Sequence, residues 1–345
     1  LIFKQASGTS RGVLTTKETY LLEISKNGQK GIGECAIFRG LSYDDVPDYE
    51  EKLTWLCENI HSDFEVLKKE LLHYPSIIFG LEQALLNLEH GEDLYFPSDF
   101  TDGKDSIKIN GLIWMGNADF MQSQIEEKLA KGFDCIKLKI GVDWKSEKEI
   151  IKKLREKFPK EQLELRVDAN GAFSYEEATI VLQELADLGI HSIEQPIKKS
   201  EVRSPKSEEN SEKKSTDCCI PWNKMARLCA ETPTPIALDE ELIGIIDFEE
   251  KKKLLETIKP QYIILKPALV GGFSGSDEWI AIAESLGINW WITSALESNI
   301  GLNAICQYTY TKKNPLPQGL GTGALFTNNF ETHLQLEGDQ MWHKK

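Results

Sequence analysis

Polar and apolar positions alternate along Phe133–Gly141, where apolar residues stand before, between and after Lys137 and Lys139. A period of two predicts a β-strand, and it directs both lysines to the same side of a sheet. The helical patterns before and after this segment favour a buried parallel strand, whose lysines would point into a site that needs positive charge. An exposed sheet edge decorated with lysines has the same pattern. This stretch alone leaves the two interpretations open.

Residues 1–104 are predicted to form an α+β unit. Strand patterns at 19–25 and 31–36 are joined by Lys26-Asn27-Gly28-Gln29, which is typical of a hairpin turn. Helical periodicity follows at 48–72 and again at 76–90, where the apolar stripe ends beside a glycine. A small antiparallel sheet followed by helices is therefore expected.

Residues 105–324 show a different pattern, in which strand and helix alternate about seven times. The predicted strands are 107–111, 135–140, 164–168, 191–194, 236–239, 262–265 and 289–293, and the predicted helices are 118–131, 146–157, 174–188, 247–256, 276–286 and 299–309. Repeated βα units predict a parallel α/β fold, and their number and length fit a (β/α) barrel better than an open sheet.

Two segments depart from this rhythm. Residues 198–217 consist almost wholly of Lys, Glu, Ser, Asn and Asp, a composition that cannot form a core, so we expect a solvated insertion there. A lid is the less favoured interpretation of the same segment. The last residues, 325–345, are expected to return as a strand to the N-terminal unit.

Composition and charge narrow the class of protein. The chain has 345 residues, enough for one large domain and a smaller one, and its net charge of −15 argues against nucleic acid and anionic membranes as partners. No apolar run approaches the length of a membrane-spanning helix. The seven cysteines are scattered and include no CxxC pair, which favours reduced thiols and a cytoplasmic location. Self-association is left open.

Three successive strands of the predicted barrel end in carboxylates, namely Asp168, Glu194 and Asp239. The carboxyl ends of parallel barrel strands meet at one mouth, so these side chains are expected to converge, repel each other and lose hydration. A divalent cation removes both costs, and oxygen ligands without Cys or His favour Mg²⁺, with Mn²⁺ as a substitute. Each acid alone could be a helix N-cap, but this is less plausible for all three.

Lysines flank the three carboxylates, because Lys137 and Lys139 precede them and Lys266 ends the strand that follows. Burial and a neighbouring like charge both lower the pKa of a lysine, so we expect Lys139 beside Lys137 to act as a general base. A metal ion on a substrate carboxylate would stabilise the charge created when the α proton leaves. The pattern predicts a site that makes an enolate from a carboxylate.

Five motifs in this order resemble the enolase superfamily in its muconate-lactonising branch. They are Lys137-Leu138-Lys139, Asp168-Ala169-Asn170, Glu194-Gln195-Pro196, Asp239-Glu240 and Lys266-Pro267. The resemblance covers nearly the whole chain and implies a modified (β/α)₇β barrel over 105–324 with an N-terminal α+β capping domain over 1–104. A lysine base working with Mg²⁺ is a known pattern of that superfamily.

Within the branch, the chain resembles the o-succinylbenzoate synthase family of menaquinone biosynthesis through Arg166, Ser294–Gly301 and Gly319–Gly323. That family dehydrates a cyclohexadiene carboxylate, 2-succinyl-6-hydroxy-2,4-cyclohexadiene-1-carboxylate (SHCHC). The resemblance implies that Lys139 takes the α proton and protonates the departing hydroxyl, that Lys266 stabilises the enolate as a cation over the ring, and that Lys137 tunes Lys139. Asp168, Glu194 and Asp239 would hold Mg²⁺. The substrate-binding positions implied are Arg166, Asn170, Ser294, Glu297, Gly321 and Thr322, with Arg11 in a closing loop of the cap.

Two alternatives stay open at this point. A dipeptide or N-acylamino acid epimerase would use the same lysine pair, but such enzymes usually carry Asp-x-Asp at the last barrel strand, where this chain has Gly321-Thr322-Gly323-Ala324-Leu325. The lack of an acid there favours the synthase. A non-catalytic metal-binding barrel is the alternative from a different class, and the complete set of lysines and acids argues against it. The insertion at 198–217 is the main departure from the family pattern.

Overall fold

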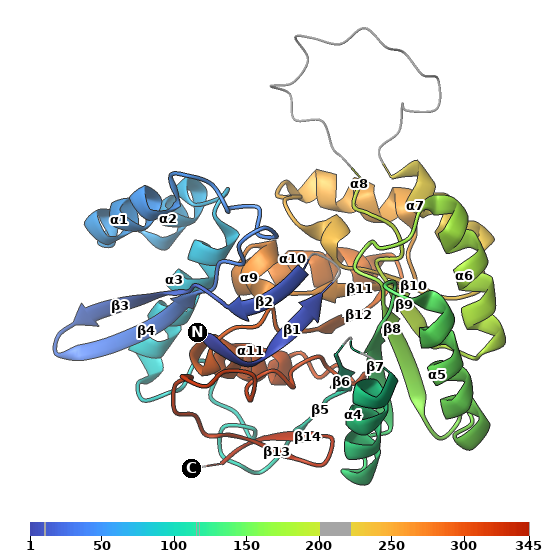
Figure 1. Ribbon diagram of the computed structural model, residues 1–345. Coiled ribbons are helices and arrows are strands. Elements are labelled where there is room, and N and C mark those ends of the chain that lie inside the picture. The colour runs from blue at the N-terminus through green and yellow to red at the C-terminus, as the bar shows by residue number, and fades with distance from the viewer. Residues whose placement is uncertain (10–11, 115, 117, 201–221, 345) are drawn as a thin grey trace, which may run out of the picture.

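Seven parallel strands form the main sheet of the computed structural model, which describes residues 1–9, 12–114, 116, 118–200 and 222–344 (Figure 1). Their order is β12-β11-β10-β9-β8-β7-β6. The strands are β6 (Gly111–Ile113), β7 (Cys135–Lys139), β8 (Glu164–Asp168), β9 (Ser192–Glu194), β10 (Ile236–Leu238), β11 (Tyr262–Leu265) and β12 (Asn289–Ile292). Most of the predicted insertion, and Arg11, lie outside the described residues.

The two edges of this sheet are joined by Gln318 and Gly319. Gly319 bridges Thr293 in parallel beyond β12, and Gln318 bridges Ile109 just before β6. The main chain of Gln318 also accepts a hydrogen bond from the backbone N–H of Asn110 at 2.9 Å. This short segment takes the place of an eighth strand and closes the sheet, so the predicted (β/α)₇β barrel is confirmed.

The first predicted barrel strand, 107–111, is wrong in its bounds. The structure divides it into β5 (Ile107–Lys108), which pairs antiparallel with a strand near the C-terminus, and β6, which pairs in parallel with β7. The backbone N–H of Ile109 bonds to the carbonyl of Asp339 at 2.8 Å while Ile109 also bridges Gln318. The chain thus changes sheets at Ile109, a change that no hydrophobic period reveals.

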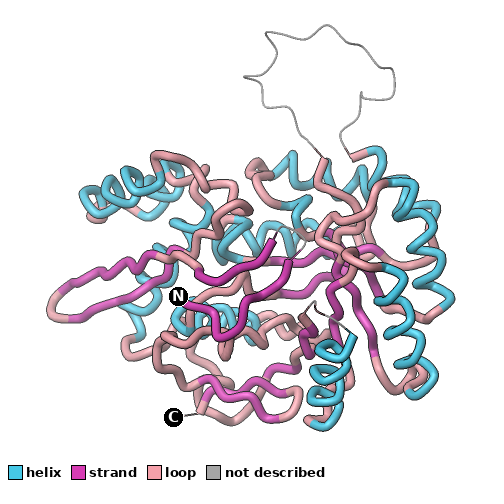
Figure 2. The backbone as a smooth tube through the Cα atoms, in the orientation of Figure 1, coloured by secondary structure: helices cyan, strands magenta, loops and turns pink. Residues whose placement is uncertain are grey.

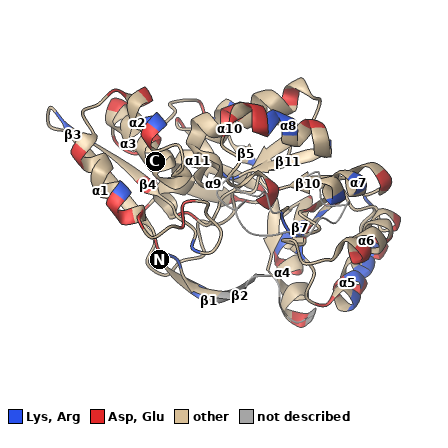
Figure 3. Ribbon diagram, turned by 90° about the horizontal axis from the view of Figure 1, so that it is seen from above, with Lys and Arg blue, Asp and Glu red and all other residues tan. Residues whose placement is uncertain are grey.

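Helices cover the outside of the barrel, as Figures 1 and 2 show. They are α4 (Ala118–Ala130), α5 (Trp144–Lys157), α6 (Tyr175–Asp187), α7 (Asn223–Glu231), α8 (Phe248–Ile258), α9 (Pro267–Val270), α10 (Gly272–Ser285) and α11 (Asn299–Thr311). Their N-termini follow local rules: Ser174 and Glu177 form a capping box on α6, and Asp247 caps α8. Acidic and basic residues are frequent on the outer helices, as Figure 3 shows for α5, α6 and α8.

The N-terminal part contains β1 (Ile2–Thr9), β2 (Gly12–Thr16), β3 (Tyr20–Lys26), β4 (Gln29–Cys35), α1 (Tyr49–Asn59), α2 (Phe64–Glu70) and α3 (Pro75–His90). Strands β3 and β4 form the predicted hairpin, and β4 lies directly on α3. A Cβ added to Gly33 would stand 1.9 Å from the carbonyl oxygen of Gly80, so strand and helix approach as closely as two backbones allow. In the described part of the chain, no helix is both long and apolar enough to cross a membrane.

The C-terminal segment contacts both halves of the molecule. The backbone of Lys4 donates to Leu325 and that of Thr327 to Ile2, which places 325–327 beside β1. Strands β13 (Leu334–Glu337) and β14 (Gln340–His343) form a hairpin that lies against β5. The division of the chain near residue 104 stays a prediction.

Two buried glutamates of the N-terminal part bind helix N-termini of the barrel. Glu34, at the end of β4, accepts hydrogen bonds from the backbone of Ser298 (3.0 Å) and Gly301 (2.9 Å) and from the Ser298 hydroxyl. Glu82 on α3 accepts from the backbone of Phe273 and Ser274 at the start of α10. Helix N-termini carry unsatisfied N–H groups and partial positive charge, so buried carboxylates are well placed there.

Glu82 gives a prediction for the pH dependence of stability. Burial raises the pKa of this carboxyl to about 7, from an ordinary value of 4.5. Between these pH values the native state binds a proton that the unfolded chain has lost, so the free energy of unfolding falls as pH rises through this window. Glu82→Gln keeps an acceptor but cannot ionise, and it should flatten that fall in urea denaturation measured across the window. Glu89→Gln, at an exposed position of the same helix, is the control, and equal slopes for both variants would contradict the prediction.

Candidate active site

The predicted lysines and carboxylates meet at the carboxyl ends of the barrel strands. Strand β7 pairs with β6 on one side and β8 on the other, so Lys137 and Lys139 lie on an interior strand and the edge-strand interpretation is wrong. Lys139 stands level with Asp168 of β8, and Asp168 stands level with Glu194 of β9. Asp239 directly follows β10 and Lys266 directly follows β11.

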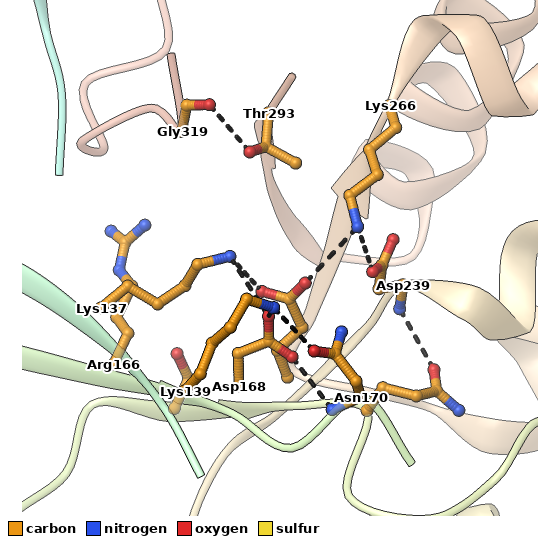
Figure 4. Close-up of polar contacts among 12 residues, drawn as sticks. Lys137, Lys139, Arg166, Asp168, Asn170, Asp239, Lys266, Thr293 and Gly319 are labelled. Carbon is orange, nitrogen blue, oxygen red and sulfur yellow. Dashed lines mark hydrogen bonds and ion pairs between the residues drawn. The ribbon is translucent and has the colours of Figure 1, made fainter. Parts of the chain in front are cut away.

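Each lysine of the site contacts a carboxylate (Figure 4). The Nζ of Lys137 lies 2.7 Å from Glu194, and the Nζ of Lys139 lies 2.9 Å from Asp168. Lys266 contacts Asp239 and lies 3.7 Å from the second oxygen of Glu194. All three carboxylates are only 2% exposed. Charges buried this deeply must be paired, and here each acid has at least one ammonium neighbour.

Negative charge is nevertheless in excess. Glu240, buried next to Asp239, adds a fourth carboxylate to the three ammonium groups of Lys137, Lys139 and Lys266. The Oε1 atom of Glu194 is buried without a hydrogen-bond partner among the described residues. Burial, together with the charges of Glu240 and Glu194, raises the pKa of Asp239 despite Lys266. An oxygen-rich cluster with more carboxylates than ammonium groups fits a hard divalent cation such as Mg²⁺.

The spacing of the three predicted ligands is set by the lysines between them. Lys137 approaches both Glu194 and Asp168, and Lys266 approaches both Glu194 and Asp239. Among the described residues, one group of three His, Cys, Asp or Glu side chains has ligand atoms that all lie within 4.8 Å of one another. Asp168, Glu194 and Asp239 are not that group. In this arrangement the lysine ammonium groups lie between the acids and balance part of their negative charge.

The acids around Lys137 dominate its charge balance, and the role of Lys139 as general base stays a prediction. Burial would lower the pKa of Lys137, but the carboxylates of Glu194 and Asp168 outweigh burial and raise it. The opposite effect operates on Asp168. Burial would raise the pKa of this carboxyl, but the ammonium groups of Lys139 and Lys137 lower it well below its ordinary range. Sequence spacing showed that Lys139 neighbours Lys137, but it did not show the carboxylates from the next two strands. These carboxylates have the larger effect on the pKa of Lys137.

A cavity opens above the charged cluster. Its walls include Phe38, Leu41, Asn110, Leu112, Trp114, Lys137, Lys139, Asp168, Asn170, Lys266, Thr293, Ser294, Ala295, Leu296, Gly319, Gly321 and Thr322. Of the predicted residues, Lys137, Lys139, Lys266, Asp168, Asn170, Ser294, Gly321 and Thr322 line it. Phe38 and Leu41 come from the N-terminal part, and sequence reasoning missed them, as it missed Trp114, because isolated apolar residues carry no motif.

Asn170 holds Lys139 from the side opposite Asp168. Its Oδ1 accepts a hydrogen bond from the Lys139 Nζ at 2.6 Å, and its Nδ2 donates to Glu240 at 3.2 Å. Asn170, two residues after β8, has a φ of 44°, and Gln195, directly after β9, has a φ of 39°, so both occupy the left-handed region just beyond a strand end. Such strained backbone often accompanies functional sites, and here it turns the Asn170 amide toward the lysine.

Ser294 and Glu297 form one hydrogen-bonded wall of the cavity. The Ser294 hydroxyl donates to Glu297 at 2.6 Å and accepts from the Thr322 hydroxyl (2.8 Å) and the backbone of Leu296 (3.0 Å). A hydroxyl has one donor and two acceptor positions, so that of Ser294 is fully used. Glu297 is completely buried and lines no part of the cavity. It orients Ser294, whereas the prediction had it bind substrate.

Arg166 lies below the cavity and does not line it. It occupies the middle of β8, two residues before Asp168, and is 1% exposed. Its guanidinium donates to Glu164 at 2.7 Å and to the carbonyl of Pro317 at 2.8 Å, and its centre lies 4.2 Å above the Trp291 ring. The structure therefore places Arg166 in the layer that fills the barrel, next to the segment that closes it.

Comparisons with known proteins agree with this architecture. The model of the "Enolase C-terminal domain-like" family matches residues 121–207 and 217–340. The o-succinylbenzoate synthase of Desulfotalea psychrophila is 42% identical over 98% of this chain and 95% of its own length, and the N-succinylamino acid racemase of Thermus thermophilus is 33% identical over 85% and 75%.

Solved structures give the same result. The crystal structure of MenC from Desulfotalea psychrophila superposes with a TM-score of 0.80 at 39% identity, covering 99% of this chain and 97% of that one. The L-Ala-D/L-Glu epimerase of Bacillus subtilis has a TM-score of 0.79 at 20% identity, over 99% and 93% of the two chains. At this identity the second likeness shows the fold alone.

Arg166 provides a test of the buried layer. Arg166→Met keeps most of the volume but removes the donor to the Pro317 carbonyl and one donor to Glu164, so we expect a loss of about 2–3 kcal/mol in the free energy of unfolding, measured in urea. Arg227→Met, at an exposed position, should change stability by less than about 0.5 kcal/mol. Unchanged stability of the Arg166 variant would argue against this packing role.

Proposed function

Since the chain belongs to the enolase superfamily and to its o-succinylbenzoate synthase family, we propose that it dehydrates SHCHC to o-succinylbenzoate in menaquinone biosynthesis. The observation that carries the proposal is the position of two lysines at one cavity. Lys139 comes from β7 and Lys266 follows β11, four strands further along a barrel that closes with eight segments. Four steps around eight bring the two ammonium groups to opposite sides of the mouth.

The reaction requires a base on one side of the substrate ring. Lys139, as the neutral amine, would take the proton α to the ring carboxylate, which breaks the C–H bond and leaves an enolate. The resulting ammonium would then give that proton to the departing hydroxyl, so the C–O bond breaks, water leaves and the ring becomes aromatic. Asn170 and Asp168 hold the Lys139 Nζ in place for both steps.

Charge on the enolate needs stabilisation from the opposite side. Lys266 lines the cavity with its ammonium group, which would lie over the electron-rich face of the ring. Asp168, Glu194 and Asp239 would hold Mg²⁺, with Mn²⁺ as a substitute, and the bound ion supplies positive charge for the substrate carboxylate. Lys137, bonded to Glu194, adds a further positive charge beneath Lys139.

The substrate's carboxylate groups need donors on the cavity wall. The Ser294 hydroxyl has no free proton, so we assign this role to the backbone N–H groups of Gly321 and Thr322. Both residues line the cavity, and neither N–H donates a hydrogen bond to another of the described residues. Phe38 and Leu41 would cover the apolar ring and exclude water from the enolate.

The remaining expectations follow from this assignment. The partner is a small-molecule carboxylate, neither nucleic acid nor membrane is expected to bind, and the reaction would take place in the cytoplasm. Self-association stays open. Arg11, predicted in a closing loop of the cap, lies outside the described residues, and its contact with substrate remains a hypothesis.

An epimerase is the second candidate, and the similarity to the N-succinylamino acid racemase of Thermus thermophilus favours it. In that reaction Lys266 would return a proton to the face opposite Lys139, whereas dehydration needs only one lysine to move protons. A barrel that binds metal without catalysis is the alternative from a different class.

The base assignment is tested with Lys139→Ala. We expect the rate of aromatic product formation from SHCHC, followed by ultraviolet absorbance, to fall by about 10²–10⁴-fold with the circular dichroism spectrum unchanged. Lys145→Ala, at an exposed position, should keep full activity. The parent protein is assayed in parallel with dipeptides and N-succinylamino acids. Normal turnover by the Lys139 variant would refute the base, and epimerisation without aromatisation would refute the synthase.

The metal assignment is tested with Asp239→Asn. Removing one ligand should weaken Mg²⁺ binding in calorimetric titration by about 100-fold or more and abolish activity at low Mg²⁺. Chelation of the parent protein with EDTA should remove activity, and Mg²⁺ or Mn²⁺ should restore it. Asp187→Asn, an exposed acid on α6, is the control. Equal Mg²⁺ affinity in both variants would exclude Asp239 as a ligand.

A further inference from the structure

Two of the six histidines meet one aspartate, and none of the three residues lines the catalytic cavity. Asp93 follows α3, His333 precedes β13, and His343 ends β14. The Oδ2 of Asp93 lies 2.9 Å from the Nδ1 of His333 and 3.1 Å from the Nε2 of His343. Ligand atoms of all three side chains lie within 4.8 Å of one another. We call these residues the His–Asp–His cluster.

The cluster is held in place by its surroundings. Asn303 and Gln307 of α11 both donate to the Asp93 carbonyl, at 2.9 and 2.8 Å, which fixes the backbone that carries this carboxylate. The β13–β14 hairpin aligns Leu334 with His343, so the two histidines stand at the same end of the hairpin. The three side chains are therefore positioned before any ligand arrives.

Burial and unsatisfied atoms indicate that the cluster lacks a component. His343 is completely buried, and its Nε2 atom is directed at Asp93. The Oδ1 of Asp93 is buried without a hydrogen-bond partner among the described residues. The Nδ1 of His343 is also unpartnered within that part of the chain, but it lies on the other side of the ring and would not contact an ion bound at Nε2. An unsatisfied buried acceptor costs free energy, and a cation shared by the carboxylate and the rings would satisfy the Asp93 oxygen.

We propose that Asp93, His333 and His343 form a structural zinc site. Two imidazole nitrogens and one carboxylate oxygen are ligands that suit Zn²⁺, whereas Mg²⁺ prefers oxygen alone. Ligand atoms about 2.1 Å from a tetrahedral Zn²⁺ ion stand about 3.4 Å apart, so the two separations from the Asp93 oxygen, 2.9 and 3.1 Å, need to open by only a few tenths of an ångström. His333, which is 43% exposed, leaves a path for the ion and a place for a water molecule as fourth ligand.

The ion would fasten the C-terminal hairpin to the barrel. Strand β14 pairs with β5. Ile109, which directly follows β5, forms a bridge with Gln318 in the segment that closes the barrel. Zinc on the His–Asp–His cluster would thus join the chain after α3 to both strands of this hairpin at its open end. We assign the ion a structural role because its three ligands come from separate segments that the ion would tie together, and the proposal does not depend on the reaction proposed for the cavity.

The test uses the full chain in saturating Mg²⁺, which occupies the predicted oxygen site. After incubation with ZnCl₂ and dialysis, we expect about one zinc per chain by mass spectrometry and a higher melting temperature. With Co²⁺ in place of Zn²⁺, we expect the intense visible absorption of a tetrahedral site, which a six-coordinate oxygen site lacks. Asp239→Asn should keep both the zinc and this absorption.

The decisive variant is His333→Gln, because this side chain is partly exposed and its loss should leave the fold intact. It should bind zinc about 100-fold more weakly or worse and lose both the Co²⁺ absorption and the zinc-dependent rise in melting temperature. His61→Gln, an exposed histidine of the N-terminal part, should behave as the parent does. Asp93→Asn provides a second ligand variant. Zinc content that is equal in the parent and in His333→Gln, or absent from the parent, would overturn the proposal.

Discussion

The interaction on which this structure depends is the pairing of buried opposite charges at the mouth of the barrel. A parallel sheet brings the ends of neighbouring strands to one edge, so acids on β8, β9 and after β10 have no means of avoiding one another. Isolated charges at such depth would be prohibitive. Lysines from β7 and from the end of β11 make the arrangement tolerable, and the remaining excess of negative charge makes it receptive to a cation.

The N-terminal part has a direct role in this balance. Phe38 and Leu41 form part of the cavity wall, so the charges of the site are shielded from water by residues that precede the barrel in the chain. Glu34 binds the N-terminus of α11, immediately after the loop whose Ser294 and Leu296 line the same cavity. The cover and the wall are therefore fixed to each other by a buried carboxylate, and loss of that contact would loosen the site as well as the interface.

Sequence reasoning found what periodicity and strand ends encode. The alternation around Lys137, and acids at three equivalent positions, located the strands, the barrel and the charged cluster, because a parallel sheet leaves few other arrangements. It could not locate features that arise from pairing between distant segments. The change of sheets at Ile109 depends on Asp339, and the raised pKa of Lys137 depends on acids from other strands. Arg166 and Asp168 are two residues apart on β8 and therefore share a face of the strand. Arg166 lies in the layer of side chains beneath the cavity, and sequence spacing does not tell that layer from the cavity wall.

The position of the lysines also explains how one scaffold serves both elimination and epimerisation. Both reactions begin with the same enolate, so the same base and the same positive charges suffice for the first step. They differ in the next proton transfer. Burial would lower the pKa of Lys266, but Asp239 and Glu194 raise it. Aromatisation makes return of the proton to the ring unfavourable, so dehydration needs no second mobile proton. In the proposed elimination Lys139 would therefore move the proton while Lys266 would remain a cation.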